Sequence, residues 1–192
     1  EANIASFIFS KEMHEAILPG ETRSILERLT QYAENELFVI RAAYSGRINL
    51  NEMPLYISIG QNENSRTVSL LIPLNNSGVV HSDILQNIKV AINSINIVLP
   101  QIIPYLKVGL KILGKELMPD GSMGHIVQLT SCKEGHEFPL AMESDGIKKI
   151  ISILSLLINV YNNHSTTVAI DELDSGIFEY LLGEILRVIS EK

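Results

Sequence analysis

One short run of residues, Thr167–Glu172, most constrains how this chain can fold. Its first four residues, Thr-Val-Ala-Ile, predict a strand, and a short run without polar alternation is typical of a strand buried on both faces of a parallel sheet. Such strands carry ligand sites at their carboxyl ends. Because Asp171 and Glu172 repel each other there, we expect a cation beside them, and Mg²⁺ with a nucleotide phosphate is the common solution. The simpler alternative is a strand that ends in solvated acids.

A second motif lies between a predicted strand and a predicted helix, at Met142–Ile147. At the start of a helix, the Ser144 hydroxyl, the free backbone N–H groups around Gly146 and the helix dipole all favour a phosphate oxygen. Simple helix capping by Ser144 would explain the same residue types. Capping does not explain why Asp171 follows 27 residues later (171 − 144), across one helix and one short loop.

The remaining patterning predicts a mixed α/β chain. Helical spacing of apolar residues predicts helices over residues 21–36, 83–99, 146–161 and 177–190. Compact or alternating apolar runs predict strands over residues 37–43, 55–59, 67–74, 106–112, 125–131, 137–141 and 167–170. We expect turns at residues 61–65, 119–121 and 133–136. We also expect Ser82 to cap the second helix and Pro100 to end it.

Composition excludes several classes of protein. The 192 residues are 46% hydrophobic, which is enough for a core, and the net charge of −7 comes without the basic stripe of a duplex-binding face. Cys132 is the only cysteine, so an internal disulfide and a Cys-based zinc site are excluded, and a buried thiol is expected. The five histidines show no metal-ligand spacing. The longest apolar stretch, residues 92–106, is interrupted by Asn, Gln and Pro, so we expect a cytoplasmic protein without a membrane span.

The two motifs together resemble the AAA-type ATPases of the ABC superfamily. The likeness rests on Glu143–Ile147, the apolar helix and Ala169–Gly176, in that order and at that spacing. It is nearest to the overcoming-lysogenization-defect and abortive-infection branch, relatives of the SMC and RecF proteins. In that branch, Glu-Ser-x-Gly stands where transporters have Leu-Ser-Gly-Gly-Gln. The likeness covers about residues 137–192, which is under a third of the chain.

The resemblance implies a role for each matched residue. Ser144 and Gly146 would contact the γ-phosphate of ATP held by a partner subunit, Asp171 would be the Walker B residue that holds Mg²⁺ through water, and Glu172 would be the catalytic base. Asp174 and Ser175 would belong to the D-loop region at the interface of a head-to-head homodimer. This chain departs from the transporter pattern at Phe178, where transporters end that loop with Asp. Binding of an effector or nuclease partner is also compatible with the family.

Other motifs of such an ATPase are missing from this sequence. The one near-match to a phosphate loop, Gly109–Glu116, ends in an acid instead of Ser or Thr and continues an alternating strand pattern, so we reject it. In the resembled family, the phosphate loop would precede Glu1 and the switch histidine would follow Lys192. We therefore expect a segment of a longer protein that is inactive by itself. Residues 1–123 would be a variable insertion between two ATPase lobes, and residues 124–192 would belong to the ATPase head.

There are two alternatives to an ATPase. The strand–Ser144–helix layout resembles a nucleophile elbow, but the chain has no histidine after His164 to complete the hydrolase order, and Met142 would crowd the turn. The stronger alternative is a non-catalytic dimerisation or regulatory module that retains an ATPase-like half-fold.

Overall fold

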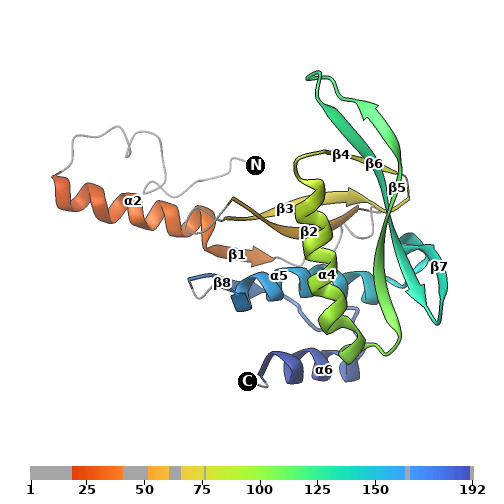
Figure 1. Ribbon diagram of the computed structural model, residues 1–192. Helices are drawn as coiled ribbons and strands as arrows, with labels where there is room; N and C mark the ends of the chain where they lie inside the picture. Colours follow the sequence, from red (N-terminus) through yellow and green to blue (C-terminus); the bar gives the residue numbers. More distant parts are fainter. Residues whose placement is uncertain (1–18, 41–51, 61–65, 76, 163–164, 191–192) are drawn as a thin grey trace, which may run out of the picture.

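The computed structural model describes residues 19–40, 52–60, 66–75, 77–162 and 165–190, with the side chain of residue 189 left out. The chain is a mixture of helices and strands, as the sequence predicted (Figure 1). The helices are α2 (Gly20–Asn35), α4 (Leu85–Ile102), α5 (Asp145–Asn162) and α6 (Glu179–Ser190), with a short 3-10 turn η3 (Leu140–Met142). The strands are β1 (Leu37–Ile40), β2 (Glu52–Ile59), β3 (Arg66–Pro73), β4 (Gly78–His81), β5 (Leu106–Leu117), β6 (Met123–Lys133), β7 (His136–Pro139) and β8 (Thr167–Ile170).

These strands form three small sheets. β1 and β8 pair in parallel, β2 and β3 form an antiparallel hairpin, and β6 lies between β5 on one side and β4 and β7 on the other. The distal part of the β5–β6 hairpin projects from the body of the molecule (Figure 1). Its turn at residues 119–121 was predicted from the sequence, as was the turn between β6 and β7 within residues 133–136.

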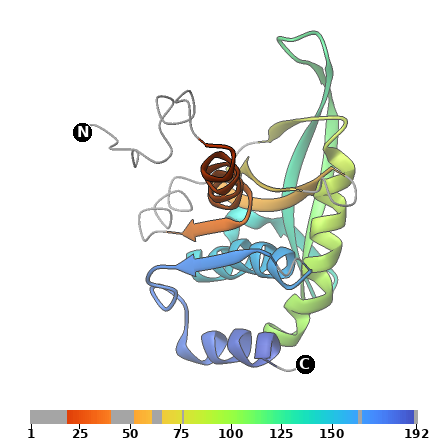
Figure 2. The same ribbon diagram turned by 90° about the vertical axis from the view of Figure 1, so that its left-hand side faces the viewer.

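One hydrophobic cluster joins these sheets through the helices. It contains residues of β2, β5 and β6 together with the apolar faces of α4 and α5, and it extends to Ile177 and Ile185. α4 packs against β2, β5, α5 and α6. It runs along one side of the molecule in Figure 2. The cluster includes residues on both sides of position 123, where the sequence analysis placed the boundary between the insertion and the ATPase head.

Polar side chains of two helices cover the edge of β2 that does not face β3. From α5, Ser152 donates to the Pro54 carbonyl at 2.9 Å, and Ser155 accepts from the Tyr56 amide at 3.1 Å. Asn159, one turn further along α5, donates to the Tyr56 carbonyl at 3.2 Å. From α4, Asn87 donates to the carbonyl of Ser58 at 2.7 Å. Helix side chains thus take the place of a neighbouring strand, and they hold α5 in a fixed position against the hairpin.

Two expectations for α4 are wrong. Pro100 does not end the helix, which continues to Ile102. A proline in the last turn removes only one helical hydrogen bond, and the packing of Leu99 and Ile102 in the core outweighs this loss. Ser82 does not cap the helix either, because its hydroxyl donates to the Met123 carbonyl at 2.7 Å and the helix begins after Ile84 without a side-chain cap.

Within the described ranges, no helix is long and apolar enough to cross a membrane.

Candidate functional site

The acid pair follows a parallel strand, as predicted, but the strand is not buried on both faces. β8 pairs with β1 from Thr167 to Ile170, and the Asp171 amide extends the ladder by donating to the Ile40 carbonyl at 2.8 Å. Thr167 and Ala169 are exposed, and the other two residues of β8 are half-buried. A four-residue apolar run suits a strand with one covered face equally well, which is why the sequence could not distinguish the two cases.

The chain then makes a tight turn over residues 171–176. Glu172 has a φ of 49°, a left-handed conformation that is rare for a residue with a side chain, and Gly176 has a φ of 75°. The Ser175 amide donates to the Glu172 carbonyl at 3.1 Å, and the Ile177 amide donates to the Asp174 carbonyl at 3.1 Å. The turn therefore directs the acidic side chains outward, and Asp171, Glu172, Asp174 and Ser175 are all exposed.

The start of α5 carries the serine and the glycine of the second motif. The Ser144 hydroxyl accepts a hydrogen bond from the Ile147 amide at 3.3 Å, so it caps the helix, and the side chain is exposed. The preceding Glu143 is buried. Its carboxylate accepts a hydrogen bond from Ser131 at 2.5 Å and lies 2.9 Å from the Lys133 ammonium, and both of these residues belong to β6. No role was expected for Glu143 from the sequence, yet this side chain attaches the beginning of α5 to the sheet formed by β4, β5, β6 and β7.

The two motifs touch each other at their glycines. A Cβ atom built on Gly146 would lie 2.5 Å from the carbonyl oxygen of Gly176, closer than real Cβ contacts allow. The start of α5 therefore lies directly against the turn that follows β8, and this approach is possible because residue 146 has no side chain. The sequence predicted both motifs, and the structure brings them into contact.

A lysine that the sequence analysis did not single out joins the two motifs more firmly. Lys149, in the first turns of α5, is only 8% exposed. Its ammonium donates to the backbone carbonyls of Glu172 at 2.8 Å and Ser175 at 2.6 Å. Burial lowers the pKa of Lys149 from its ordinary value of 10.5, although the negative charges of Asp174 and Glu172 act in the opposite direction. The only sequence signal for it was a cation inside a strongly apolar helix.

Exposed side chains surround these motifs. Met142 and Tyr180 are 74% and 72% exposed, and Phe178, the residue that departs from the transporter pattern, is 84% exposed. The exposed carboxylates of Asp171 and Glu172 are chemically suited to bind a hydrated Mg²⁺ or to accept a proton from water. Among the described residues, no group of three or more His, Cys, Asp or Glu side chains is arranged to hold a metal ion by itself.

The rejected phosphate-loop match lies within β5. Gly109–Glu116 pairs with β6 along this stretch, apart from a register shift between Ile112 and Gly114. Gly109 has a packing role, because a Cβ at this position would lie closer to the Thr130 hydroxyl than real Cβ contacts allow. That hydroxyl donates to Glu137 at 2.7 Å. Glu137 also pairs with Lys111 at 3.0 Å, and these two partners lower its pKa, with Thr130 as the larger cause.

Cys132 is a free thiol and is half-buried, whereas a buried thiol was expected.

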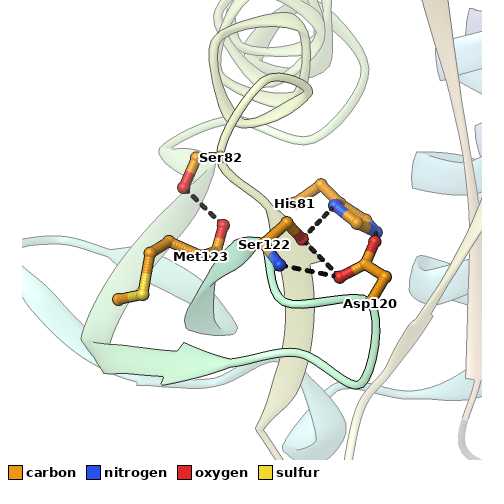
Figure 3. A network of polar contacts seen from close by, with 5 residues as sticks. All are labelled: His81, Ser82, Asp120, Ser122 and Met123. Atoms are coloured by element: carbon orange, nitrogen blue, oxygen red, sulfur yellow. Dashed lines mark hydrogen bonds and ion pairs between the residues drawn. The ribbon is translucent and has the colours of Figure 1, made fainter.

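One other polar cluster contains the residue types of a serine hydrolase, at the turn of the β5–β6 hairpin (Figure 3). The Ser122 hydroxyl donates to Asp120 at 2.7 Å and lies 3.1 Å from Nδ1 of His81, while Nε2 of His81 is 3.8 Å from the second Asp120 oxygen. In a catalytic triad, the histidine stands between the serine and the acid. Here the serine proton points to the acid directly, so the cluster stabilises the turn and does not form a nucleophile.

Comparisons of the chain with protein-family models, with curated proteins and with solved structures gave no match. The assignment of a function therefore depends on the chemistry of the site.

Proposed function

We propose that this chain is part of an ABC-type AAA ATPase and supplies a signature motif and a Walker B acid pair to a composite ATP site between two copies. In this proposal, the Ser144 hydroxyl and the Gly146 amide bind the γ-phosphate on the partner copy. Asp171 holds Mg²⁺ through water, and Glu172 accepts the proton of the attacking water. Asp174 and Ser175 lie in the interface between the copies.

The contact between Gly146 and Gly176 carries the proposal. A composite site needs the phosphate-binding helix start and the acid-bearing turn of one copy to form a single rigid surface, and this contact supports such a surface. The exposure of Ser144, Asp171 and Glu172 leaves their polar atoms available to a ligand from outside the chain. The first-turn amides of α5 have no acceptor within their own helix, which is the general basis of anion binding at helix starts.

The decisive experiment is substitution of the proposed base in the protein that contains this chain. We expect Glu172→Gln to reduce kcat for ATP hydrolysis by about 10²–10⁴-fold, because a general base is lost, while ATP-driven dimers persist because the amide retains the shape of the side chain. Glu179→Gln, an exposed acid in the first turn of α6, is the matched control and should keep the parental rate. Parental turnover by the Glu172→Gln protein would show that the Walker B assignment is wrong.

The isolated chain provides a second test. Because the phosphate loop contributes most of the ATP affinity in P-loop proteins, calorimetric titration of residues 1–192 with Mg-ATP should give negligible binding. Micromolar affinity would contradict the proposal that the site is incomplete without another segment.

One observation favours the second candidate, a non-catalytic dimerisation or regulatory module. The ammonium of Lys149 attracts the charges of Glu172 and Asp174, so part of the repulsion between the acids is compensated without Mg²⁺. This candidate predicts that Glu172→Gln and Glu179→Gln behave alike and that ATP does not change the oligomeric state. Sedimentation of both variants of the protein that contains this chain, with and without Mg-ATP, measures the oligomeric state and distinguishes the two candidates.

A further inference from the structure

We propose that Lys149 is the positioning residue that fixes the 172–175 turn against the start of α5 and thereby sets the place of the Glu172 side chain. Its part in ATP turnover rests on the function proposed above, whereas its part in the structure of the turn does not.

The contact geometry is the first argument. An ammonium group has three donors and no acceptor, and here two of the donors reach the carbonyls of Glu172 and Ser175, which stand at the two ends of one turn. Hydrogen bonds from a charged donor are stronger than those between neutral groups. A single side chain of α5 therefore holds both ends of the turn.

The burial of Lys149 is the second argument. Removing an ammonium from water is costly, and a position that is only 8% exposed on an apolar helix face would be filled more cheaply by Leu or Met. The structure compensates this cost with two carbonyl oxygens and with the negative charges of Glu172 and Asp174. All four compensating groups belong to the turn, so the lysine is suited to this segment in particular.

The backbone of the turn is the third argument. Glu172 is held in a left-handed conformation, which residues other than glycine adopt only when the surrounding structure imposes it. The local hydrogen bonds from the Ser175 and Ile177 amides are those of an ordinary turn and do not connect it to another element. The bonds from Lys149 provide this connection, and they attach to the residue with the unfavourable φ.

Lys148 provides a matched control within the same helix. It is 5% exposed, similar to Lys149, but its ammonium donates to Asp145 of the same helix at 3.0 Å. Substitution of either lysine by methionine keeps most of the side-chain volume and removes one buried charge. Only the substitution at position 149 removes a bond to the 172–175 turn.

The test is amide hydrogen exchange, which needs no nucleotide. In Lys149→Met, the amides of Ser175 and Ile177 should exchange at least about tenfold faster than in the parent. The amides of Thr167 and Asp171, which donate to the carbonyls of Glu36 and Ile40, should keep their rates. Lys148→Met should leave the turn unchanged. Equal exchange of the turn in both variants would overturn the proposal.

A measurement on the unsubstituted chain covers the case in which Lys149→Met does not fold. Scalar couplings across hydrogen bonds should connect the Lys149 Nζ to the carbonyl carbons of Glu172 and Ser175, and the Lys148 Nζ should show no coupling to either. A spectrum in which the Lys149 ammonium is resolved but uncoupled to both carbonyls would overturn the proposal.

Kinetics separate this inference from the proposed function. If the protein that contains this chain hydrolyses ATP, Lys149→Met should lower kcat at least about tenfold and change KM for ATP by less than about threefold, because a misplaced Glu172 affects the chemical step more than binding. Lys148→Met should change neither. The exchange and coupling measurements decide the positioning role even if the protein proves not to hydrolyse ATP.

Discussion

At the scale of single residues, the tightest steric constraint in the candidate site lies at Gly146. We expect Gly146→Ala to destabilise the chain by about 1–3 kcal/mol, because the new Cβ would press on the backbone carbonyl of Gly176, which cannot turn aside as a side chain can. Gly183→Ala in α6 is the control: nothing lies within 4 Å of its Cβ position, so it should stabilise the helix by about 0.5–1 kcal/mol. Urea unfolding of both variants measures the difference, and equal shifts would contradict the close contact.

A second prediction at this scale concerns the carboxyl of Asp120. Its hydrogen bonds from Ser122 lower its pKa below the ordinary 3.8, and the side-chain hydroxyl is the largest cause. The stability gained from this ionised carboxylate is present above pH 3.8 and is lost as the pH falls through the lowered pKa. Ser122→Ala should raise the pKa toward 3.8 in an NMR titration of the Asp120 carboxyl. Ser82→Ala, which removes a neighbouring hydroxyl bonded to Met123, should leave it unchanged.

At the scale of elements, the hydrogen bonds between α5 and the edge of β2 determine the position of α5. Ser155→Ala removes the hydroxyl that accepts from the buried Tyr56 amide, and we expect a loss of about 1–3 kcal/mol in unfolding free energy. In Ser94→Ala, the lost hydroxyl bonds only to Val90 of its own helix, so the change should stay within about 0.5 kcal/mol. Thermal unfolding compares them. A similar cost for both would mean that the β2 edge does not depend on α5.

Elements of this chain could be predicted from sequence where one physical signal dominates. Thr167–Ile170 and the helix that begins near Gly146 agree with the structure because a β-branched run and an apolar period of 3.6 are local properties. The prediction at Pro100 was wrong because the local effect of proline opposes helix, whereas the packing of its neighbours Leu99 and Ile102 in the core favours helix. The roles of Ser152 and Lys149 could not be predicted, since a polar residue in an apolar helix does not reveal which distant backbone it will bond.

At the scale of the whole molecule, the candidate site is the place where three separate sheets are tied together. Glu143 links the start of α5 to the sheet that contains β6. Ser152 links the middle of α5 to the β2–β3 hairpin, and Lys149 links α5 to the turn after β8. α5 is thus the common support, with the polar bonds made at successive positions along it. A change in the position of α5 would therefore be transmitted to the exposed acids.

The buried ammonium in this support should be visible in the pH dependence of the stability of the entire chain. Because burial holds the folded pKa of Lys149 below 10.5, the unfolded chain binds more protons between the folded pKa and 10.5. The free energy of unfolding therefore contains a term that rises with pH across this window and is constant below it. The negative charges of Asp174 and Glu172 raise the folded pKa of Lys149 and so narrow this pH window, but burial still keeps that pKa below 10.5.

Urea unfolding from about pH 7 to 10.5 measures this term. The free energy of unfolding should rise with pH in Lys148→Met and should depend less on pH in Lys149→Met. The two variants carry the same tyrosines and, apart from positions 148 and 149, the same lysines. Parallel curves would therefore mean that the folded pKa of Lys149 is not lowered.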